Sequence, residues 1–132
     1  GVDFVNDSKS TNIDSLRVAL ESFAKPVTLI AGGRGKGADY RVLRELVRRH
    51  VRNMITIGED APLLEAAFGD IVVHKRATTM EEAVRMSGKS TASGGVVLLS
   101  PACASFDMFD NFEHRGRVFK ECVRRYAEGV AR

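Results

Sequence analysis

The chain has 132 residues, of which 44% are hydrophobic and 28% are charged, and its formal net charge is +3 at pH 7. This length suits one domain with a sizeable core, and the composition excludes a disordered, collagen-like or coiled-coil chain. The longest apolar runs, at 27–31 and 96–99, are far shorter than the ~20 residues of a membrane span, and the acidic start predicts no signal peptide.

Short apolar runs and amphipathic windows alternate along the chain, and this alternation predicts an α/β fold. In chain order, we expect strands at 2–5, 27–31, 54–57, 71–74 and 96–99. We expect helices at 13–24, 39–51, 62–68, 80–87 and 112–130.

Local signals support several helix ends. Pro62 suits a first helical position, and Thr79 with Glu82 has the spacing of a capping box. Gly69 and Gly88 follow helical windows, as C-terminal stops do.

The strand at 96–99 is apolar at every position, which indicates burial on both faces. Such strands are typical of a mainly parallel sheet in a three-layer sandwich. Ligands of these sheets bind at the carboxyl ends of the strands, so the segments that follow the strands are the places to search for chemistry.

Seven polar residues at 6–12 separate the first strand from the first helix. Asn12 or Thr11 is expected to cap that helix, which accounts for one of the seven. Lys9 adds nothing to a cap. Because it stands among hydroxyl groups and a carboxylate near a helix N-terminus, it predicts contact with an anion or a nucleotide.

Four glycines and two cations occupy 32–39, directly after the second strand. The segment is either a plain glycine-rich turn or a loop whose N–H groups approach a phosphate. The P-loop pattern fails, because Ile30 stands where its first glycine belongs and Gly37 where its hydroxyl belongs. The dinucleotide pattern matches at 33–38, with Glu59 as the acidic ribose partner, so a Rossmann-type dinucleotide-binding or regulatory module is an alternative.

Small residues fill 100–107, where they either allow tight packing or form part of a site. Cys103 with His114 as its base would make a nucleophile, but apolar surroundings should raise the pKa of the thiol and nothing orients the histidine. Ser105, beside a helix start, is better suited to donate a hydrogen bond to a carboxylate. No Cys, His or Asp spacing predicts a structural metal site.

The basic excess lies in the last helix, since residues 113–132 hold six basic and three acidic groups. A second basic stretch, at 41–52, lies opposite an apolar stripe and fits a solvated helix face. We therefore expect no nucleic-acid partner, although a nucleic-acid-binding domain that uses these arginines is a third hypothesis.

Two cysteines are too few for a disulfide scaffold, so we expect a reduced, cytoplasmic setting.

The segments 6–12, 32–39 and 100–107, each of which follows an expected strand, are here called the three polar segments. Together they resemble the C-terminal domain of the Mur ligases, in particular the type that adds D-glutamate. The resemblance covers almost the full length and rests on the runs NDSKSTN at 6–12, GG at 32–33 with Lys36 and Asp39, and SPACAS at 100–105 followed by Asp107, NFE at 111–113 and RG at 115–116. It implies a three-layer α/β/α sandwich with a Rossmann-like mixed sheet of six strands, mostly parallel with the first strand antiparallel.

The resemblance also implies an ATP-dependent ligase of peptidoglycan precursor synthesis. In such enzymes the carboxylate of UDP-N-acetylmuramoyl-L-alanine is phosphorylated, and the amine of D-glutamate attacks the acyl phosphate. They have an N-terminal domain for the UDP substrate, a central domain for ATP and Mg, and a last domain that brings the amino acid.

Residues 1–132 would be that last domain alone. We therefore expect a fragment that is inactive by itself, taken from a cytoplasmic, monomeric enzyme. Its expected partners are the two small-molecule substrates and the central and N-terminal domains of the same enzyme, with no membrane contact.

Roles for individual residues are implied as well. Lys36 and Thr11 would hold one carboxylate of D-glutamate. Ser105 and the backbone N–H of Phe112 would hold the other. A dicarboxylic amino acid needs two separated anion sites of this kind, because each charge binds its own donors.

The nucleotide would meet two further residues. Lys9 would approach the transferring phosphate as the catalytic group, and Asp7 would contact the ribose, while ATP and Mg would be held mainly by the central domain. Two positions depart from the usual pattern of these enzymes: Arg34 is a basic residue in the glycine segment, and Ser10 stands where alanine is more usual.

Overall fold

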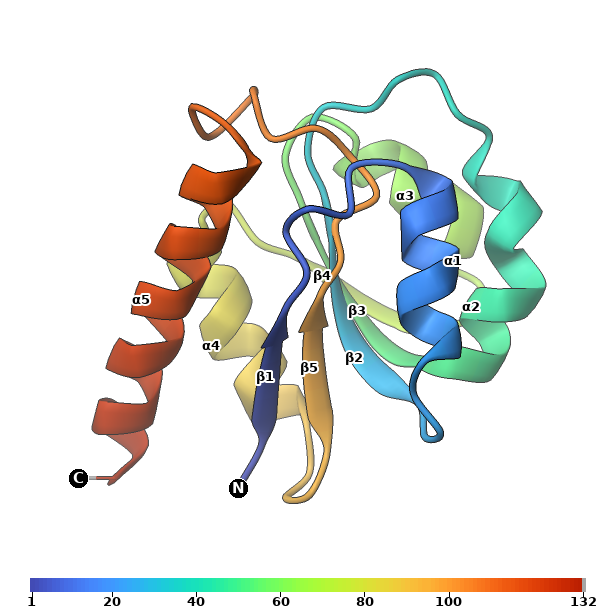
Figure 1. The fold of residues 1–132 in the computed structure, drawn as a ribbon. Coiled ribbons are helices and arrows are strands. Elements are labelled where there is room, and N and C mark those ends of the chain that lie inside the picture. Colours follow the sequence, from blue (N-terminus) through green and yellow to red (C-terminus); the bar gives the residue numbers. More distant parts are fainter. Residues whose placement is uncertain (132) are drawn as a thin grey trace.

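The computed structural model describes residues 1–131, in which strands and helices alternate as an α/β fold requires (Figure 1). The strands are β1 (Asp3–Asn6), β2 (Val27–Gly32), β3 (Val51–Ile57), β4 (Val73–Arg76) and β5 (Val96–Leu99). The helices are α1 (Ile13–Glu21), the 3-10 helix η1 (Tyr40–Leu43), α2 (Arg44–His50), α3 (Ala61–Phe68), α4 (Met80–Ser90) and α5 (Phe112–Ala131).

The five strands form one sheet in the order β1-β5-β2-β3-β4, and all its pairs are parallel. The expectation of six strands with an antiparallel first strand is wrong for residues 1–131. β1 runs parallel to β5, with Asp3 opposite Val96 and Asn6 opposite Leu99. Each described strand is followed by a helix that returns the chain to the same edge of the sheet before the next strand begins, which makes the pairs parallel.

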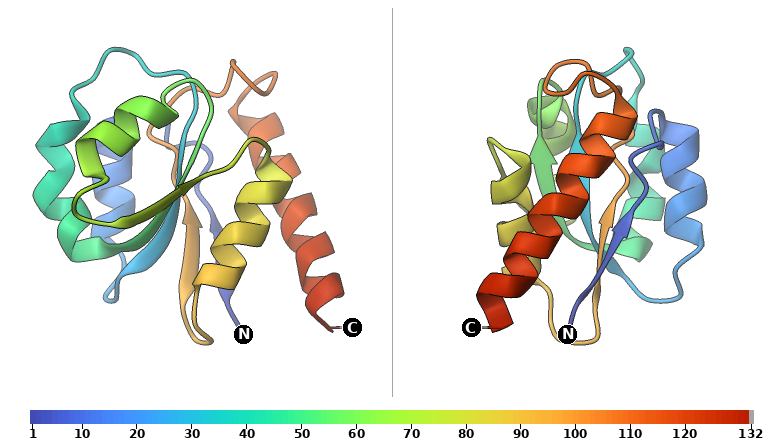
Figure 2. Two further views of the ribbon diagram at one scale, coloured as in Figure 1. Left: turned by 180° about the vertical axis from the view of Figure 1, so that it is seen from behind. Right: turned by 60° about the vertical axis from the view of Figure 1, so that its left-hand side comes forward.

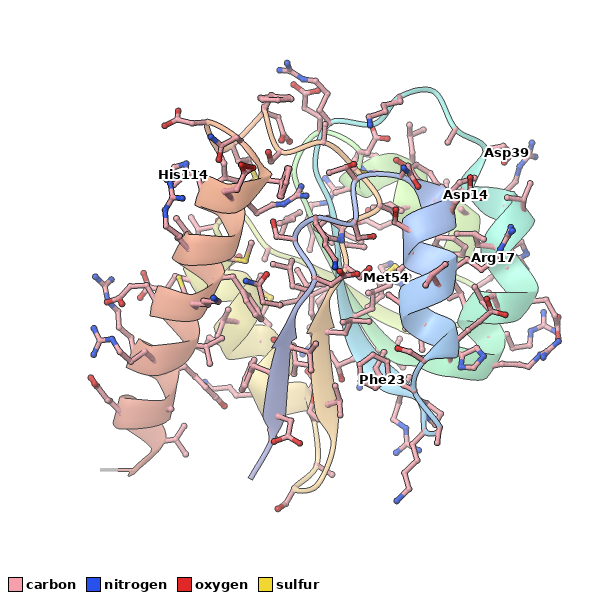
Figure 3. The ribbon with its side chains drawn as sticks, viewed as in Figure 1. Asp14, Arg17, Phe23, Asp39, Met54 and His114 are labelled. Carbon is pink, nitrogen blue, oxygen red and sulfur yellow. The ribbon has the colours of Figure 1, made fainter. Side chains whose placement is uncertain are left out.

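Helices α1, α2 and α3 cover one face of the sheet (Figures 1 and 2). Their buried side chains, among them Leu20, Val47 and Phe68, pack in one cluster with Leu29 and Met54 of the sheet. Figure 3 shows Met54 in the interior between these helices and the strands.

Helices α4 and α5 cover the opposite face, where Val84 and Phe119 pack with Ile30 and Ile55. Since β2 is buried at all six of its positions, the three-layer sandwich predicted from the apolar strands is confirmed. Among the helices of residues 1–131, none combines the length and the apolar character needed to cross a membrane.

Two helix caps are formed as their sequences predict. The Asn12 side chain accepts a hydrogen bond from the Ser15 N–H at 2.9 Å and begins α1. Thr79 accepts from the Glu82 N–H at 3.1 Å and begins α4. The Glu82 carboxylate returns to the N–H of Thr78 and not to that of Thr79, so the box closes one residue earlier than its usual form.

The segment at 39–51 does not form one helix. It begins as the 3-10 helix, continues as α2, and enters β3 at Val51, three residues before the expected strand start. β4 also begins two residues later than expected, at Val73. Apolar residues of Val type are compatible with either element here, so tertiary pairing with β2 decides where helix ends and strand begins.

Pro62 is the second residue of α3 instead of the first, and Gly69 ends that helix as predicted. Gly88, however, lies inside α4 and does not stop it. A Cβ at this position would lie 2.5 Å from the ring of Tyr126 on α5. Gly88 therefore allows α4 and α5 to approach closely, which a pattern of single-helix signals does not reveal.

Candidate ligand-binding site at the carboxyl edge of the sheet

The three polar segments singled out in the sequence follow three neighbouring strands. Because β5 lies between β1 and β2, the segments 6–12, 100–107 and 32–39 lie side by side at the upper edge of the sheet in Figure 1. Helices α1 and α2, which follow the outer two strands, cover one face, whereas α5, which follows β5, covers the other. A reversal of this kind opens a crevice at the carboxyl edge, which is where α/β sheets bind ligands.

Hydrogen bonds tie the first segment to the third. The N–H of Asp7 donates to the Leu99 carbonyl at 2.8 Å, and the Ser100 hydroxyl donates to the Asp7 carboxylate at 3.0 Å. The Ala102 N–H donates to the Ser10 carbonyl at 3.0 Å, with Ala102 at a φ of 64°. Asp7 is thus held in place at the end of β1 by the segment that follows β5.

The second segment is tied to the third by a pair of backbone hydrogen bonds between Arg34 and Ala104, at 2.9 and 3.0 Å. Gly33 makes this contact possible: its φ is 135°, and a Cβ there would lie 2.3 Å from the Ala104 carbonyl oxygen. The bridge places Lys36 two residues from one of its ends and Ser105 one residue from the other.

Lys9 and Phe112 line the same cleft, which has a volume of about 280 Å³ and also includes Arg117 and Lys120 of α5. The N–H of Phe112, the first residue of α5, makes no hydrogen bond within residues 1–131, because the Asn111 side chain caps the N–H of His114 instead. A free N–H at the start of a helix is suited to bind an anion. The structure therefore brings these two predicted site residues together.

Lys9 also borders a second cavity, of about 560 Å³, which it shares with Asp7 and Ser10. A larger cavity of about 620 Å³ lies at the opposite, amino edge of the sheet, next to Lys25 and Arg52. None of the predicted site residues lines that larger cavity, so its size does not make it the site. The polar segments, and not cavity volume, locate the candidate site.

The remaining predicted residues lie on the same edge without sharing one of these cavities. Lys36 is exposed, Thr11 is half-buried, and Ser105 is 2% exposed. Within residues 1–131 none of the three side chains makes a hydrogen bond or an ion pair, so none of their polar groups is engaged by another residue.

Two observations count against the dinucleotide alternative. Glu59, its proposed ribose partner, forms an ion pair with Arg34 at 3.1 Å, and this pairing raises the pKa of the arginine. In addition, η1 begins only at Tyr40, eight residues beyond the end of β2, so no helix N-terminus lies at the glycines to receive a pyrophosphate (Figure 3 shows the capping residue Asp39).

The other residue that departs from the family pattern, Ser10, is completely buried. Its hydroxyl has no hydrogen-bond partner among the described residues. Burial of an unpaired hydroxyl lowers the stability of the folded protein. We therefore expect Ser10 to stabilise the fold less than an alanine would at this position.

The Cys103 thiol is not arranged as a nucleophile. It is fully buried beneath the glycine segment, 3.1 Å from the hydroxyl of Tyr40, and burial raises its pKa to about 11. His114 accepts instead from the N–H of Asp110 at 3.1 Å and packs edge-on against Phe109, on the first turn of α5 (Figure 3). The interpretation of the sequence against a Cys–His pair is confirmed.

Arg115 entered the sequence-based predictions only as part of the resemblance, with no role assigned to it, and its side chain is 1% exposed. Its guanidinium donates to the Ser8 hydroxyl at 2.9 Å, the Ser8 carbonyl at 2.6 Å and the Cys103 carbonyl at 2.9 Å. Burial lowers its pKa to about 10. Helical spacing offered a signal, because 115, 119 and 122 fall on one stripe of α5, and Phe119 and Cys122 of that stripe are buried.

In the described part of the chain, no group of three or more Asp, Glu, His or Cys side chains is arranged so that it could hold a metal ion. The candidate site therefore contains two exposed lysines, hydroxyl groups, the free N–H of Phe112 and one carboxylate. This donor set is suited to bind carboxylates and phosphates.

Several known proteins are similar in sequence to this chain. Residues 1–103 match the family described as Mur ligase, glutamate ligase domain. Three curated relatives are each named UDP-N-acetylmuramoylalanine--D-glutamate ligase. The one from Coxiella burnetii (strain Dugway 5J108-111) is 53% identical over 126 residues, which are 92% of this chain and 28% of the relative.

The relative from Koribacter versatilis (strain Ellin345) is 51% identical over 129 residues, or 97% of this chain and 28% of the relative. The one from Pelodictyon phaeoclathratiforme (strain DSM 5477 / BU-1) is 50% identical over 125 residues, or 95% and 27%. The chain thus spans less than a third of the length of these relatives. It belongs to the Mur ligase family, whose glutamate ligase domain it contains.

Proposed function

We propose that this chain is the C-terminal, amino-acid-binding domain of a three-domain, ATP-dependent ligase that adds D-glutamate to UDP-N-acetylmuramoyl-L-alanine. The meeting of three polar segments over β1, β5 and β2 carries the proposal, because it assembles anion-binding groups at one edge of the sheet. The names of relatives that are about half identical in sequence support the same activity.

In this proposal the two carboxylates of D-glutamate bind at separate places. Lys36 and Thr11 hold one of them, and Ser105 with the N–H of Phe112 holds the other. The absence of competing hydrogen bonds from these groups within residues 1–131 supports the assignment. Each charge-assisted hydrogen bond stabilises the bound state by about 1.5–3 kcal/mol, so four donors would contribute substantially to binding of a small dicarboxylate.

Lys9 is proposed to stabilise the phosphoryl group during transfer. Its ammonium is exposed beside the cleft that Phe112 lines, so it faces the region in which the amino acid would bind. A cation placed there lowers the energy of the developing charge without forming a covalent bond. Asp7, fixed by the Ser100 hydroxyl, is proposed to bind the ribose of the nucleotide.

ATP and Mg are proposed to bind mainly outside this chain, in a central domain. The described residues fit this division, because no helix begins at the glycines of the glycine segment and no cluster of metal-binding side chains occurs among them. The partners in the proposal are D-glutamate, UDP-N-acetylmuramoyl-L-alanine and the other two domains of a monomeric, cytoplasmic enzyme.

Replacement of Lys36 tests the proposal in the full-length protein that contains this chain. We expect Lys36→Ala to lower kcat/KM for D-glutamate by about two orders of magnitude, because a charge-assisted contact to one carboxylate is lost. Phosphate release at saturating concentrations of ATP and UDP-N-acetylmuramoyl-L-alanine, measured over a range of D-glutamate concentrations, gives this ratio.

Lys89→Ala is the matched control, since Lys89 is an exposed lysine on α4, far from the carboxyl edge. It should leave the kinetics unchanged. Near-normal D-glutamate kinetics in Lys36→Ala would contradict the assignment of Lys36 to the site. A wild-type protein without D-glutamate-dependent turnover would refute the proposed function itself.

A further inference from the structure

Arg115 is a buried cation that the proposed ligand set does not use. Its guanidinium forms no ion pair among the described residues, and its three hydrogen bonds end on neutral oxygens of Ser8 and Cys103. A guanidinium remains charged inside a protein, so its burial is tolerated only where acceptors are placed to receive its donors. The acceptors here come from two segments that are 95 residues apart in the chain.

Each of these contacts lies next to a residue of the proposed site. Ser8 is the neighbour of Lys9, and Cys103 lies two residues before Ser105. The Ser8 hydroxyl also donates to the Phe112 carbonyl at 2.7 Å while it accepts from Arg115. The guanidinium of Arg115 and the hydroxyl of Ser8 thereby connect the segment 6–12, which contains Lys9, with the segment 100–107, which contains Ser105, and with the start of α5.

Gly116 allows α5 to come near enough for these bonds. A Cβ at this position would lie 3.1 Å from the Asn6 side-chain nitrogen and 3.4 Å from the Ser8 Cβ, closer than most side chains tolerate. The Asn6 side chain donates in addition to the Gly116 carbonyl, at 3.5 Å. The first turn of α5 therefore packs directly against residues 6–8, with Arg115 at the centre of the contact.

We propose that Arg115 is a positioning residue, which holds Lys9 at a fixed separation from the carboxylate-binding pair of Ser105 and Phe112. The chemistry of this inference rests on the proposed function, and its geometry rests on the three hydrogen bonds. Fixed separation matters because the amine of the incoming amino acid must meet the activated carboxyl group in a narrow range of distances, and a small displacement strongly lowers the rate.

The geometric part is tested by amide hydrogen exchange in the full-length protein. The Ser10 N–H donates to the Asp7 carbonyl within the first of the two segments that Arg115 joins, and the Ala102 N–H donates from the second segment to the Ser10 carbonyl. In Arg115→Ala we expect both to exchange about tenfold faster or more, because the guanidinium that bridges the two segments is lost, while amides of β2 and β3 keep their wild-type rates. Arg124→Ala, which removes an exposed arginine of the same helix, is the control and should change neither segment.

The functional part is tested by steady-state kinetics. Arg115→Ala should raise KM for D-glutamate about tenfold or more and lower kcat, and leave KM for ATP within about twofold, because ATP is bound mainly elsewhere. Arg115→Lys should recover part of the loss, since an ammonium can still donate to one of the two segments. Ser8→Ala, which removes only the bridging hydroxyl, should change D-glutamate kinetics in the same direction by a smaller factor.

Wild-type exchange rates at both segments in Arg115→Ala overturn the inference, whatever the activity. If Arg115→Ala does not fold, Ser8→Ala decides, and unchanged D-glutamate kinetics in the folded variant overturn the inference. Equal increases in KM for ATP and D-glutamate would assign a general structural role and overturn it too. A wild-type protein without D-glutamate-dependent turnover would refute the proposed function instead, and the exchange rates would still decide whether Arg115 joins the two segments.

Discussion

The thiol of Cys103 lies under the glycine segment, where the hydroxyl of Tyr40 contacts it and none of its surface reaches solvent. That hydroxyl also donates to the Asp60 carboxylate at 2.5 Å. Burial disfavours a thiolate, so at this position a residue type that often serves as a nucleophile is part of the interior.

We expect Cys103 to be unreactive in the folded protein. With a pKa of about 11, only about one thiol in a thousand is ionised at pH 8, and the fraction grows tenfold with each unit as pH rises towards that value. A Cys122→Ser variant isolates Cys103, and the rate of its reaction with a disulfide reagent such as DTNB measures the prediction. Reaction of the native protein within seconds at pH 8, as fast as after denaturation, would contradict it.

Residues differ in how far sequence reveals their roles. Lys9, Lys36 and Ser105 stand in polar or glycine-rich segments that follow strands, so the sequence points to them directly. No role was predicted for Arg115, because its contacts are with two residues, Ser8 and Cys103, that only the folded chain brings to it. Glu59 was interpreted as a ribose ligand for the same reason, since its pairing with Arg34 is a contact between separate loops.

Helix α4 begins at a cap whose contribution can be separated from packing. The Thr79 hydroxyl satisfies the Glu82 N–H, one of the first N–H groups that the helix itself leaves without a partner. We expect Thr79→Ala to lower the free energy of unfolding by about 1 kcal/mol, measured by urea denaturation of the 132-residue chain.

The neighbouring residue provides the control for this cap. Thr78 contributes only its backbone N–H, to the Glu82 carboxylate, and its exposed hydroxyl makes no hydrogen bond within residues 1–131. Thr78→Ala should therefore leave the stability within a few tenths of a kcal/mol of the wild type. Equal effects of the two substitutions would show that the cap contributes nothing of its own.

The sequence predicted the type and approximate position of elements that have a clear apolar periodicity or a capping residue. Several of the residues at which these elements begin or end were predicted wrongly. α1, α3 and β5 lie where apolar spacing and capping residues place them. The boundary between α2 and β3 was misplaced because Val51 suits both a helix and a strand, and pairing with Val27 of β2 decides between them. Strand order was beyond sequence reasoning altogether, since the apolar pattern of β5 does not specify its neighbours.

As a whole molecule, the chain has a core on each face of its sheet, so we expect it to fold in isolation. Under the proposed function it should nevertheless form no amide bond from ATP, UDP-N-acetylmuramoyl-L-alanine and D-glutamate. Circular dichroism with a cooperative thermal transition would establish folding, and product formation would be assayed beside the full-length enzyme. Turnover by the isolated chain would show that the active site is complete within it.

The position of β5 has a consequence for biosynthesis. β1 precedes the other described strands in the chain, yet its only partner among them is β5, the last of the five. β2, β3 and β4 can pair as they emerge, whereas β1 must wait as an unpaired ribbon until residues 96–99 insert between it and β2. The same insertion brings the three polar segments together, so the nascent chain acquires its candidate ligand-binding site at the moment when its sheet closes.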